Sequence, residues 1–206
     1  MAKASISAVL FDFGGVLADE GFRNGLTKIA IDSGLDPQEF FENAQKAIFS
    51  SGYLIGHGTE SSFWNRLRTW KAFIGEDIEL REIILKGFIL RQWMVDIVEK
   101  LKNASIRTAI LSDQTNWLDE LEERLHFSSH FERVFNSFHL GKSKADPGIF
   151  TDVLASMGLM PEETLFIDDT LGHVERARSK GLFAIHFQGR EQFMKEMRLY
   201  FPVLLP

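Results

Sequence analysis

The chain has 206 residues, of which 45% are hydrophobic and 25% charged, an ordinary globular balance that argues against disorder. Its 23 basic and 29 acidic residues give a net charge of −6 with no basic run or basic-aromatic patch, so we expect no nucleic-acid partner. The lack of cysteine excludes disulfides, thiolate metal sites and a cysteine nucleophile.

Apolar stretches in the chain are short. None has the length and cleavage-site pattern of a signal peptide, and none approaches the roughly 20 residues needed to span a bilayer. We therefore expect a cytoplasmic protein with no membrane partner. Separately, we expect either a monomer or a homodimer.

The first predicted element is a buried strand that ends on a single carboxylate. An apolar run over residues 8–11 is typical of a parallel strand buried on both faces, and it leads directly into Asp12. Ligands of open α/β sheets bind at this carboxyl edge. Gly14 and Gly15 follow, and glycines let the backbone turn sharply and approach a ligand closely. Asp12 is therefore a candidate nucleophile or metal ligand.

Residues 18–92 show no convincing strand pattern and predict a small helical bundle. Asp36 before Pro37 is typical of a helix N-cap and first turn. Apolar residues at helical spacing predict two further helices, one through Phe63, Leu67, Trp70 and Ile74 and one through Leu80, Ile84 and Phe88 that could extend to Arg91. The glycine-rich segment 53–60, which contains His57, predicts a mobile or substrate-facing loop.

Three further strands in the C-terminal part end on polar residues. Residues 107–111 lead into Ser112 and Asp113, residues 134–138 into a loop with Lys142 and Lys144, and residues 164–167 into Asp168 and Asp169. Helix capping or solvation could explain each residue alone, but four strand ends in succession favour one shared site. The alternating elements predict an α/β fold with a doubly wound, mostly parallel sheet. Residues 1–17 and 93–206 would form its core, and 18–92 an inserted helical domain.

These residues resemble the haloacid dehalogenase-like hydrolase superfamily, whose members are mostly magnesium-dependent phosphatases. The resemblance spans residues 8 to about 188. It rests on Asp12 with Gly15-Val16-Leu17, on Ser112, on Lys144-Ala145-Asp146-Pro147-Gly148-Ile149-Phe150, and on Phe166-Ile167-Asp168-Asp169 followed by Val174-Glu175-Arg176-Ala177 and Gly181-Leu182. It implies a Rossmann-like core in which residues 18–92 are a cap that covers the site and selects the substrate.

The resemblance also implies roles for individual residues. Asp12 would attack phosphorus and form an aspartyl-phosphate, Ser112 would donate a hydrogen bond to the phosphoryl group, and Lys144 would neutralise its charge. Mg²⁺ would be held by Asp12, Asp169 and the Gly14 carbonyl, with Asp168 orienting this shell. We place the substrate-binding residues at Gly14, Gly15, Asp113 and His57. The implied activity is that of a Mg²⁺-dependent phosphohydrolase for a small phosphorylated metabolite.

Two positions depart from the family pattern. The family's phosphatases carry a second aspartate two residues after the nucleophile, which acts as general acid and then as base, and here that residue is Gly14. Such help is commonly worth about 10²–10⁴ in rate. Asp19 and His57 are candidate substitutes. The other departure is His173, where the family often has Asn or Asp; it could hold a water of the metal shell, but we favour a solvent-facing position.

The missing aspartate leaves four functions open. The first is a phosphatase whose leaving group needs little protonation, such as an anomeric sugar phosphate or acyl phosphate, or one with a substitute acid from the cap. The second is a haloacid dehalogenase, whose halide leaves without a proton, although such enzymes generally dispense with the metal and with paired carboxylates like Asp168 and Asp169. The third is a catalytically weak or idle binding protein. A phosphomutase, which also needs the missing acid, is the weakest.

Overall fold

A computed structural model describes residues 6–205, and it contains a single five-stranded sheet in which all strand pairs are parallel. The strands are β1 (Ala8–Phe11), β2 (Arg107–Ser112), β3 (Arg133–Asn136), β4 (Thr164–Asp168) and β5 (Phe183–His186), in the spatial order β3-β2-β1-β4-β5. This confirms the predicted α/β fold. Because β1 lies in the centre with Phe11 opposite both Ile110 and Ile167, the residues that follow β1, β2 and β4 come out side by side.

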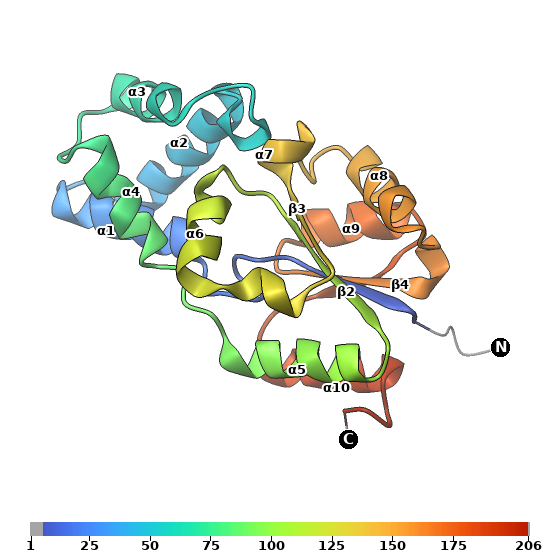
Figure 1. The fold of residues 1–206 in the computed structure, drawn as a ribbon. Helices are drawn as coiled ribbons and strands as arrows, with labels where there is room; N and C mark the ends of the chain where they lie inside the picture. The colour runs from blue at the N-terminus through green and yellow to red at the C-terminus, as the bar shows by residue number, and fades with distance from the viewer. Residues whose placement is uncertain (1–5, 206) are drawn as a thin grey trace.

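Helices cover both faces of the sheet (Figure 1). One face is covered by α5 (Gln92–Asn103) and α10 (Arg190–Tyr200), and the other by α8 (Gly148–Met157) and α9 (Leu171–Ser179). Side chains of β1 alternate between the two layers, with Val9 and Phe11 in the first hydrophobic cluster and Ala8 and Leu10 in the second. Burial on both faces explains why β1 is a continuous apolar run.

The remaining short elements join the core strands. They are α6 (Trp117–Leu125), η2 (Phe127–His130), α7 (Ser137–Leu140) and η3 (Pro161–Glu163). Ser137 and Phe138 thus begin a helix, whereas the sequence analysis placed them at the end of a strand. The Asn136 side chain accepts a hydrogen bond of 3.2 Å from the backbone N–H of Phe138, which stops the extended conformation there. Among residues 6–205, no helix combines the length and apolar character that crossing a membrane requires.

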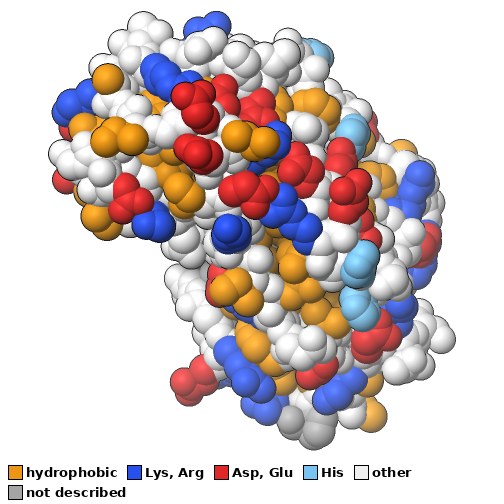
Figure 2. Space-filling view, turned by 60° about the vertical axis from the view of Figure 1, so that its left-hand side comes forward, with side chains coloured by type: hydrophobic (Ala, Val, Ile, Leu, Met, Phe, Trp, Pro, Cys, Tyr) orange, Lys and Arg blue, Asp and Glu red, His pale blue; other side chains and the backbone are white. Residues whose placement is uncertain are grey.

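Residues 18–92 form the predicted helices, and within them the structure assigns no strand beyond an isolated bridge. The helices are α1 (Gly21–Asp32), α2 (Pro37–Ser50), η1 (Tyr53–Ile55), α3 (Glu60–Trp70) and α4 (Asp77–Leu85). Asp36 caps α2 as expected, accepting a hydrogen bond of 2.7 Å from the backbone N–H of Glu39. In Figure 1 these helices lie beyond the carboxyl ends of the strands, and in Figure 2 they form the upper lobe of the molecule.

The predicted helix through Ile74 ends earlier than its apolar stripe suggested. Helix α3 stops at Trp70, and Lys71 adopts an extended conformation with φ −159°. Ile74 is therefore outside the helix and 76% exposed. Likewise, α4 ends at Leu85, and Phe88 beyond it is buried against the ring of Phe13 rather than on a continued helix.

Two short segments connect the helical lobe to the sheet, and they lie side by side. Ala18 forms an antiparallel bridge with Leu90, the Asp19 N–H donates to the Ile89 carbonyl at 2.9 Å, and the Arg91 N–H donates to the Leu17 carbonyl at 2.9 Å. Arg91 Nε also lies 3.1 Å from Asp19 Oδ1. The lobe is thus fixed next to the loop that follows Asp12.

Candidate active site

Asp12 extends the central strand and lies almost entirely buried at its carboxyl end. Its Oδ1 accepts hydrogen bonds from the Phe13 backbone N–H at 2.7 Å and from Ser112 Oγ at 2.9 Å. Its Oδ2 lies 2.7 Å from the ammonium of Lys144. Burial raises the pKa of Asp12 well above its usual value, Lys144 opposes this, and the neighbouring Asp168 and Asp169 raise it further. The carboxylate is therefore crowded by like charge and oriented on both oxygens.

Among the described residues around Asp12, Lys144 is the one fully buried side chain with a positive charge. Its Nζ lies between Asp12 Oδ2, at 2.7 Å, and Asp168 Oδ2, at 2.6 Å. Its backbone N–H donates to Asp113 Oδ1 at 2.8 Å, which fixes the loop after α7. Burial alone would lower the pKa of Lys144, but Asp12, Asp168 and Asp113 together raise it above its ordinary value. The side chain is therefore an ammonium ion at neutral pH.

Asp168 lies behind Lys144 and is fully buried. One of its oxygens accepts a hydrogen bond of 2.7 Å from the Thr170 N–H, and His173 Nδ1 lies 3.2 Å from both. Burial would raise the pKa of Asp168, but Lys144 and His173 hold it below its ordinary value. His173 is thus turned into the site, contrary to the solvent-facing position favoured above, and its Nε2 lies 4.0 Å from Asp113 Oδ2.

Asp169 packs against Gly15. A Cβ at Gly15 would come within 2.0 Å of Asp169 Oδ2, and the Gly15 φ of +76° is itself unfavourable for other residues. Within residues 6–205 Asp169 makes no ion pair; its Oδ1 accepts a hydrogen bond of 3.4 Å from Thr170 Oγ1. Burial and the adjacent Asp168 raise the pKa of Asp169.

These residues fit a hard divalent cation. Ligand atoms of Asp12, Asp168 and His173 lie within 4.8 Å of one another, but Lys144 already neutralises Asp168. The remaining excess of negative charge lies on Asp12 and Asp169, whose pKa values are both raised. A cation among carboxylate and carbonyl oxygens would relieve this repulsion, and Mg²⁺ prefers such ligands.

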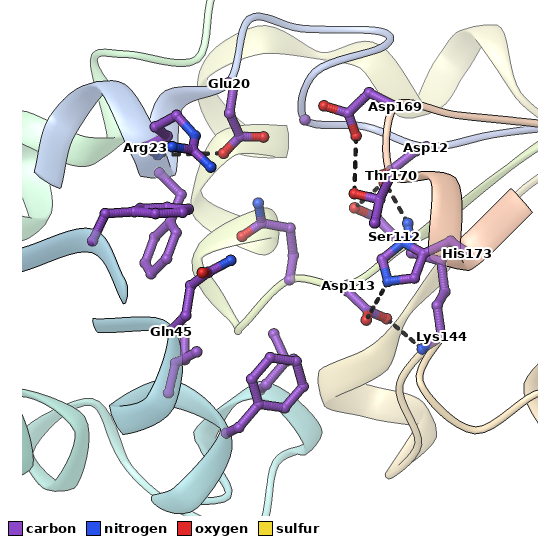
Figure 3. A pocket seen from close by; sticks show the side chains of 17 residues that line it. Asp12, Glu20, Arg23, Gln45, Ser112, Asp113, Lys144, Asp169, Thr170 and His173 are labelled. Atoms are coloured by element: carbon purple, nitrogen blue, oxygen red, sulfur yellow. Dashed lines mark hydrogen bonds and ion pairs between the residues drawn. The ribbon is translucent and has the colours of Figure 1, made fainter. Parts of the chain in front are cut away.

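A pocket of about 280 Å³ opens between the sheet and the helical lobe (Figure 3). Its lining comprises Asp12, Gly14, Ser112, Asp113, Gln114, Lys144, Asp169, Thr170 and His173 from the core, and Glu20, Phe22, Arg23, Phe41, Gln45, Ile48, Phe49 and Leu54 from the lobe. The core side is polar and carries the three aspartates, while the lobe contributes the carboxyl group of Glu20. The lobe side is mostly aromatic and aliphatic.

Most of the predicted site residues meet at this pocket. Asp12, Gly14, Ser112, Asp113, Lys144 and Asp169 line it, while Asp168 supports Lys144 and Gly15 packs against Asp169. His57 is exposed in the segment after η1 and is not among the lining residues. Asp19 is not among them either, and pairs with Arg91 instead. The structure gives neither of the two proposed substitute acids a place at the pocket.

The sequence analysis missed the lining residues that come from the lobe. Glu20 caps α1, its Oε1 accepting a hydrogen bond of 3.3 Å from the Arg23 N–H. The Arg23 guanidinium lies 3.7 Å from the centre of the Phe41 ring, and Gln45 follows one helical turn later on α2. An acidic residue before Gly21 carries a weak capping signal, but no spacing rule could have indicated that these side chains face Asp12.

A model of haloacid dehalogenase-like hydrolases matches residues 6–179, and the chain belongs to this family. It is therefore an enzyme of the hydrolase class. Flavin mononucleotide hydrolase 1 of Arabidopsis thaliana is 25% identical over 122 residues, which are 59% of this chain and 50% of that protein. The GMP/IMP nucleotidase of Escherichia coli is 23% identical over 190 residues, 88% of this chain and 82% of that enzyme.

The fold is shared with a haloacid dehalogenase family enzyme of Bacteroides thetaiotaomicron. Its crystal structure has a TM-score of 0.75 at 21% identity and covers 94% of this chain and 99% of its own. The same enzyme has been solved with magnesium and inorganic phosphate, with a TM-score of 0.67 at 22% identity over 88% of this chain and 93% of its own. The chain spans half or less of several matched relatives, including 38% of mouse bifunctional epoxide hydrolase 2, which is 23% identical over 94% of this chain.

Proposed function

We propose that the protein is a Mg²⁺-dependent phosphohydrolase that releases phosphate from a small phosphorylated metabolite through an aspartyl-phosphate on Asp12. The observation that carries this proposal is the placement of Asp12, held by Ser112 and Lys144 at the bottom of a pocket. A phosphate monoester brings an anion to an anionic nucleophile, so the site must supply positive charge and alignment.

The side chains around Asp12 divide these tasks. Phe13 N–H and Ser112 Oγ orient its carboxylate, and Ser112 can also donate to a phosphoryl oxygen. Lys144, kept protonated by its carboxylate neighbours, neutralises charge on the transferring group. Asp12, Asp169 and the Gly14 carbonyl would hold Mg²⁺, which would polarise the phosphoryl group and offset its charge. Asp168 positions Lys144 and the backbone of Thr170.

The lobe side of the pocket indicates what the rest of the substrate resembles. Phe22, Phe41 and Leu54 present apolar surface, while Arg23 and Gln45 offer hydrogen-bond donors at the same wall. A planar ring with polar edges fits such a wall better than a short alkyl chain does. The names of two relatives, a flavin mononucleotide hydrolase and a GMP/IMP nucleotidase, are in keeping with a monophosphate of this kind.

The test is a panel of phosphate monoesters assayed with Mg²⁺ and with EDTA, beside 2-haloacids. We expect phosphate release that requires Mg²⁺ and is fastest for ring-bearing monophosphates. Halide release without metal would instead indicate a dehalogenase. The missing side chain at Gly14 is compatible with that hypothesis, since a halide leaves without a proton. No release of phosphate or halide would favour a binding protein.

A further inference from the structure

Hydrolysis of an alkyl phosphate needs a proton for the leaving oxygen. The inference about which residue supplies this proton rests on the proposed function. Several pocket groups are already committed. Asp12 is the proposed nucleophile, Lys144 lies between two carboxylates, and Asp113 accepts from the Lys144 backbone. His173 is turned toward Asp168. Asp169 lies beside Asp12 on the proposed metal side.

Glu20 is the carboxyl group in the pocket lining to which the preceding assignments give no role. Its Oε1 accepts a hydrogen bond from Arg23 N–H, and in the described part of the chain Oε2 makes no hydrogen bond or ion pair. Figure 3 shows its carboxyl group at the wall of the pocket, between Arg23 and Asp169 in this view. One oxygen of the Glu20 carboxyl group is therefore held by the helix cap, and the other faces the pocket that Asp12 lines.

The space beside Gly14 is complementary to Glu20. A Cβ built on Gly14 would lie 3.2 Å from Glu20 Oε2 and 3.3 Å from Phe88 Cε1. Gly14 does not have the positive φ of Gly15, so its backbone angle does not require glycine. The absence of a side chain at Gly14 leaves a space in the pocket, and the carboxyl group of Glu20 borders this space.

We propose that Glu20 is the general acid and base of this active site. As an Asp12 oxygen bonds to phosphorus, the bond from phosphorus to the leaving oxygen breaks, its electron pair stays on that oxygen, and the Glu20 carboxyl proton moves there to give the free alcohol. The Glu20 carboxylate then takes a proton from the water that attacks the aspartyl-phosphate. The bond from phosphorus to Asp12 breaks, and inorganic phosphate and the Asp12 carboxylate are released.

Glu20 also connects catalysis to the helical lobe. It immediately precedes α1 and lies two residues after Ala18, whose bridge to Leu90 joins the lobe to the sheet. The lobe therefore brings the proton donor to the phosphate together with the wall that contacts the leaving group.

The first experiment compares leaving groups in Glu20→Gln, which keeps the size of the side chain and a hydrogen-bond acceptor for the α1 cap. p-Nitrophenolate is a weak base and leaves without protonation. The alkoxide of glycerol is strongly basic and needs a proton as it leaves. With saturating Mg²⁺ we expect kcat/KM for glycerol phosphate to fall about 10²–10⁴-fold and that for p-nitrophenyl phosphate to fall far less. Asp19→Asn is the matched control, an adjacent acid outside the pocket, and should change neither rate.

A second pair of variants tests whether a carboxyl group is needed at this place in the pocket, independently of what the Glu20 side chain contributes to stability. Glu20→Ala removes the atom closest to a Cβ at Gly14, so Gly14→Asp in that background has room for its carboxyl group. We expect kcat/KM for glycerol phosphate to be at least about tenfold higher in the double variant than in Glu20→Ala. Melting temperatures within a few degrees of the wild type establish that all variants are folded.

Equal losses for both substrates in a folded Glu20→Gln, or unchanged rates for both, would overturn the assignment of Glu20 while leaving the phosphohydrolase intact. Failure of the wild type to hydrolyse any phosphate monoester with Mg²⁺ would instead overturn the proposed function, and the role of Glu20 with it.

Discussion

The ammonium group of Lys144 joins Asp12 to Asp168, at 2.7 Å from an oxygen of the first and 2.6 Å from an oxygen of the second. Because Asp12 directly follows β1 and Asp168 is the last residue of the neighbouring β4, one buried cation fixes the relative position of two strand ends. Its positive charge also opposes the effect of burial, which raises the pKa of Asp12. Breaking a buried pair of this kind leaves an uncompensated charge, so the residues act as a unit.

Asp12→Asn should abolish turnover while the protein remains folded. Asparagine keeps the shape and one acceptor oxygen, but its amide cannot form an acyl-phosphate by nucleophilic attack. We expect phosphate release under saturating Mg²⁺ to drop on the order of 10⁴-fold or more. Circular dichroism would verify the fold. Full activity of the folded variant would refute the covalent mechanism.

Asp169→Ala should weaken Mg²⁺ binding and activity together. Asp169 is a pocket carboxylate beside Asp12 that makes no ion pair among residues 6–205, and removing it would delete a proposed ligand. Calorimetric titration should show an affinity lower by about tenfold or more, equivalent to about 1.4 kcal/mol. Unchanged Mg²⁺ binding would remove Asp169 from the metal shell and would strengthen the dehalogenase alternative.

The core of this site could be predicted because its residues lie at the carboxyl ends of buried strands or directly after them. Asp12, Ser112 and Asp168 need only the strand pattern and the rule that parallel strands share one carboxyl edge. Glu20 and Arg23 could not be found in this way, since their place depends on how the helical lobe docks. That docking is set by pairings such as Ala18 with Leu90, which are far apart in the sequence.

Periodicity also failed to locate two side chains correctly. The apolar stripe extended to Ile74, but α3 ends at Trp70, and spacing alone does not mark where a helix stops. His173 lies in the first turn of α9, where spacing does not decide between solvent and the site. Its approach to Asp168 follows from the turn at Thr170, whose N–H is bonded to the same carboxylate.

Acidification from neutral pH toward the ordinary aspartate range should stabilise the metal-free protein. Burial raises the pKa of Asp12, Asp113 and Asp169, so in this range the folded state binds more protons than the unfolded state. The free energy of unfolding therefore rises as pH falls. Asp168 has the opposite sign, but its pKa is lowered, so the stability it contributes is lost only at pH values below the ordinary aspartate range.

Differential scanning calorimetry in EDTA would measure this effect as a higher Tm at pH 5.5 than at pH 7.5. Saturating Mg²⁺ should raise the Tm most at pH 7.5, because the cation and protons compete for the same carboxylates. Asp12→Asn should reduce the pH difference. A Tm that falls steadily over this range in EDTA would contradict the predicted proton uptake.

Gly15→Ala should impair Mg²⁺ binding and turnover beyond its cost in stability. The added Cβ would lie 2.0 Å from Asp169 Oδ2, so the carboxylate must move, and φ of +76° adds backbone strain. Gly34→Ala is the matched control, since Gly34 has a similar φ of +68° but no atom within 4 Å of an added Cβ. Both variants should lose about 1–2 kcal/mol in the free energy of unfolding from strain. Only Gly15→Ala should also lose Mg²⁺ affinity by calorimetry and phosphate release, and equal activity in the two variants would show that the contact between Gly15 and Asp169 does not position the metal ligand.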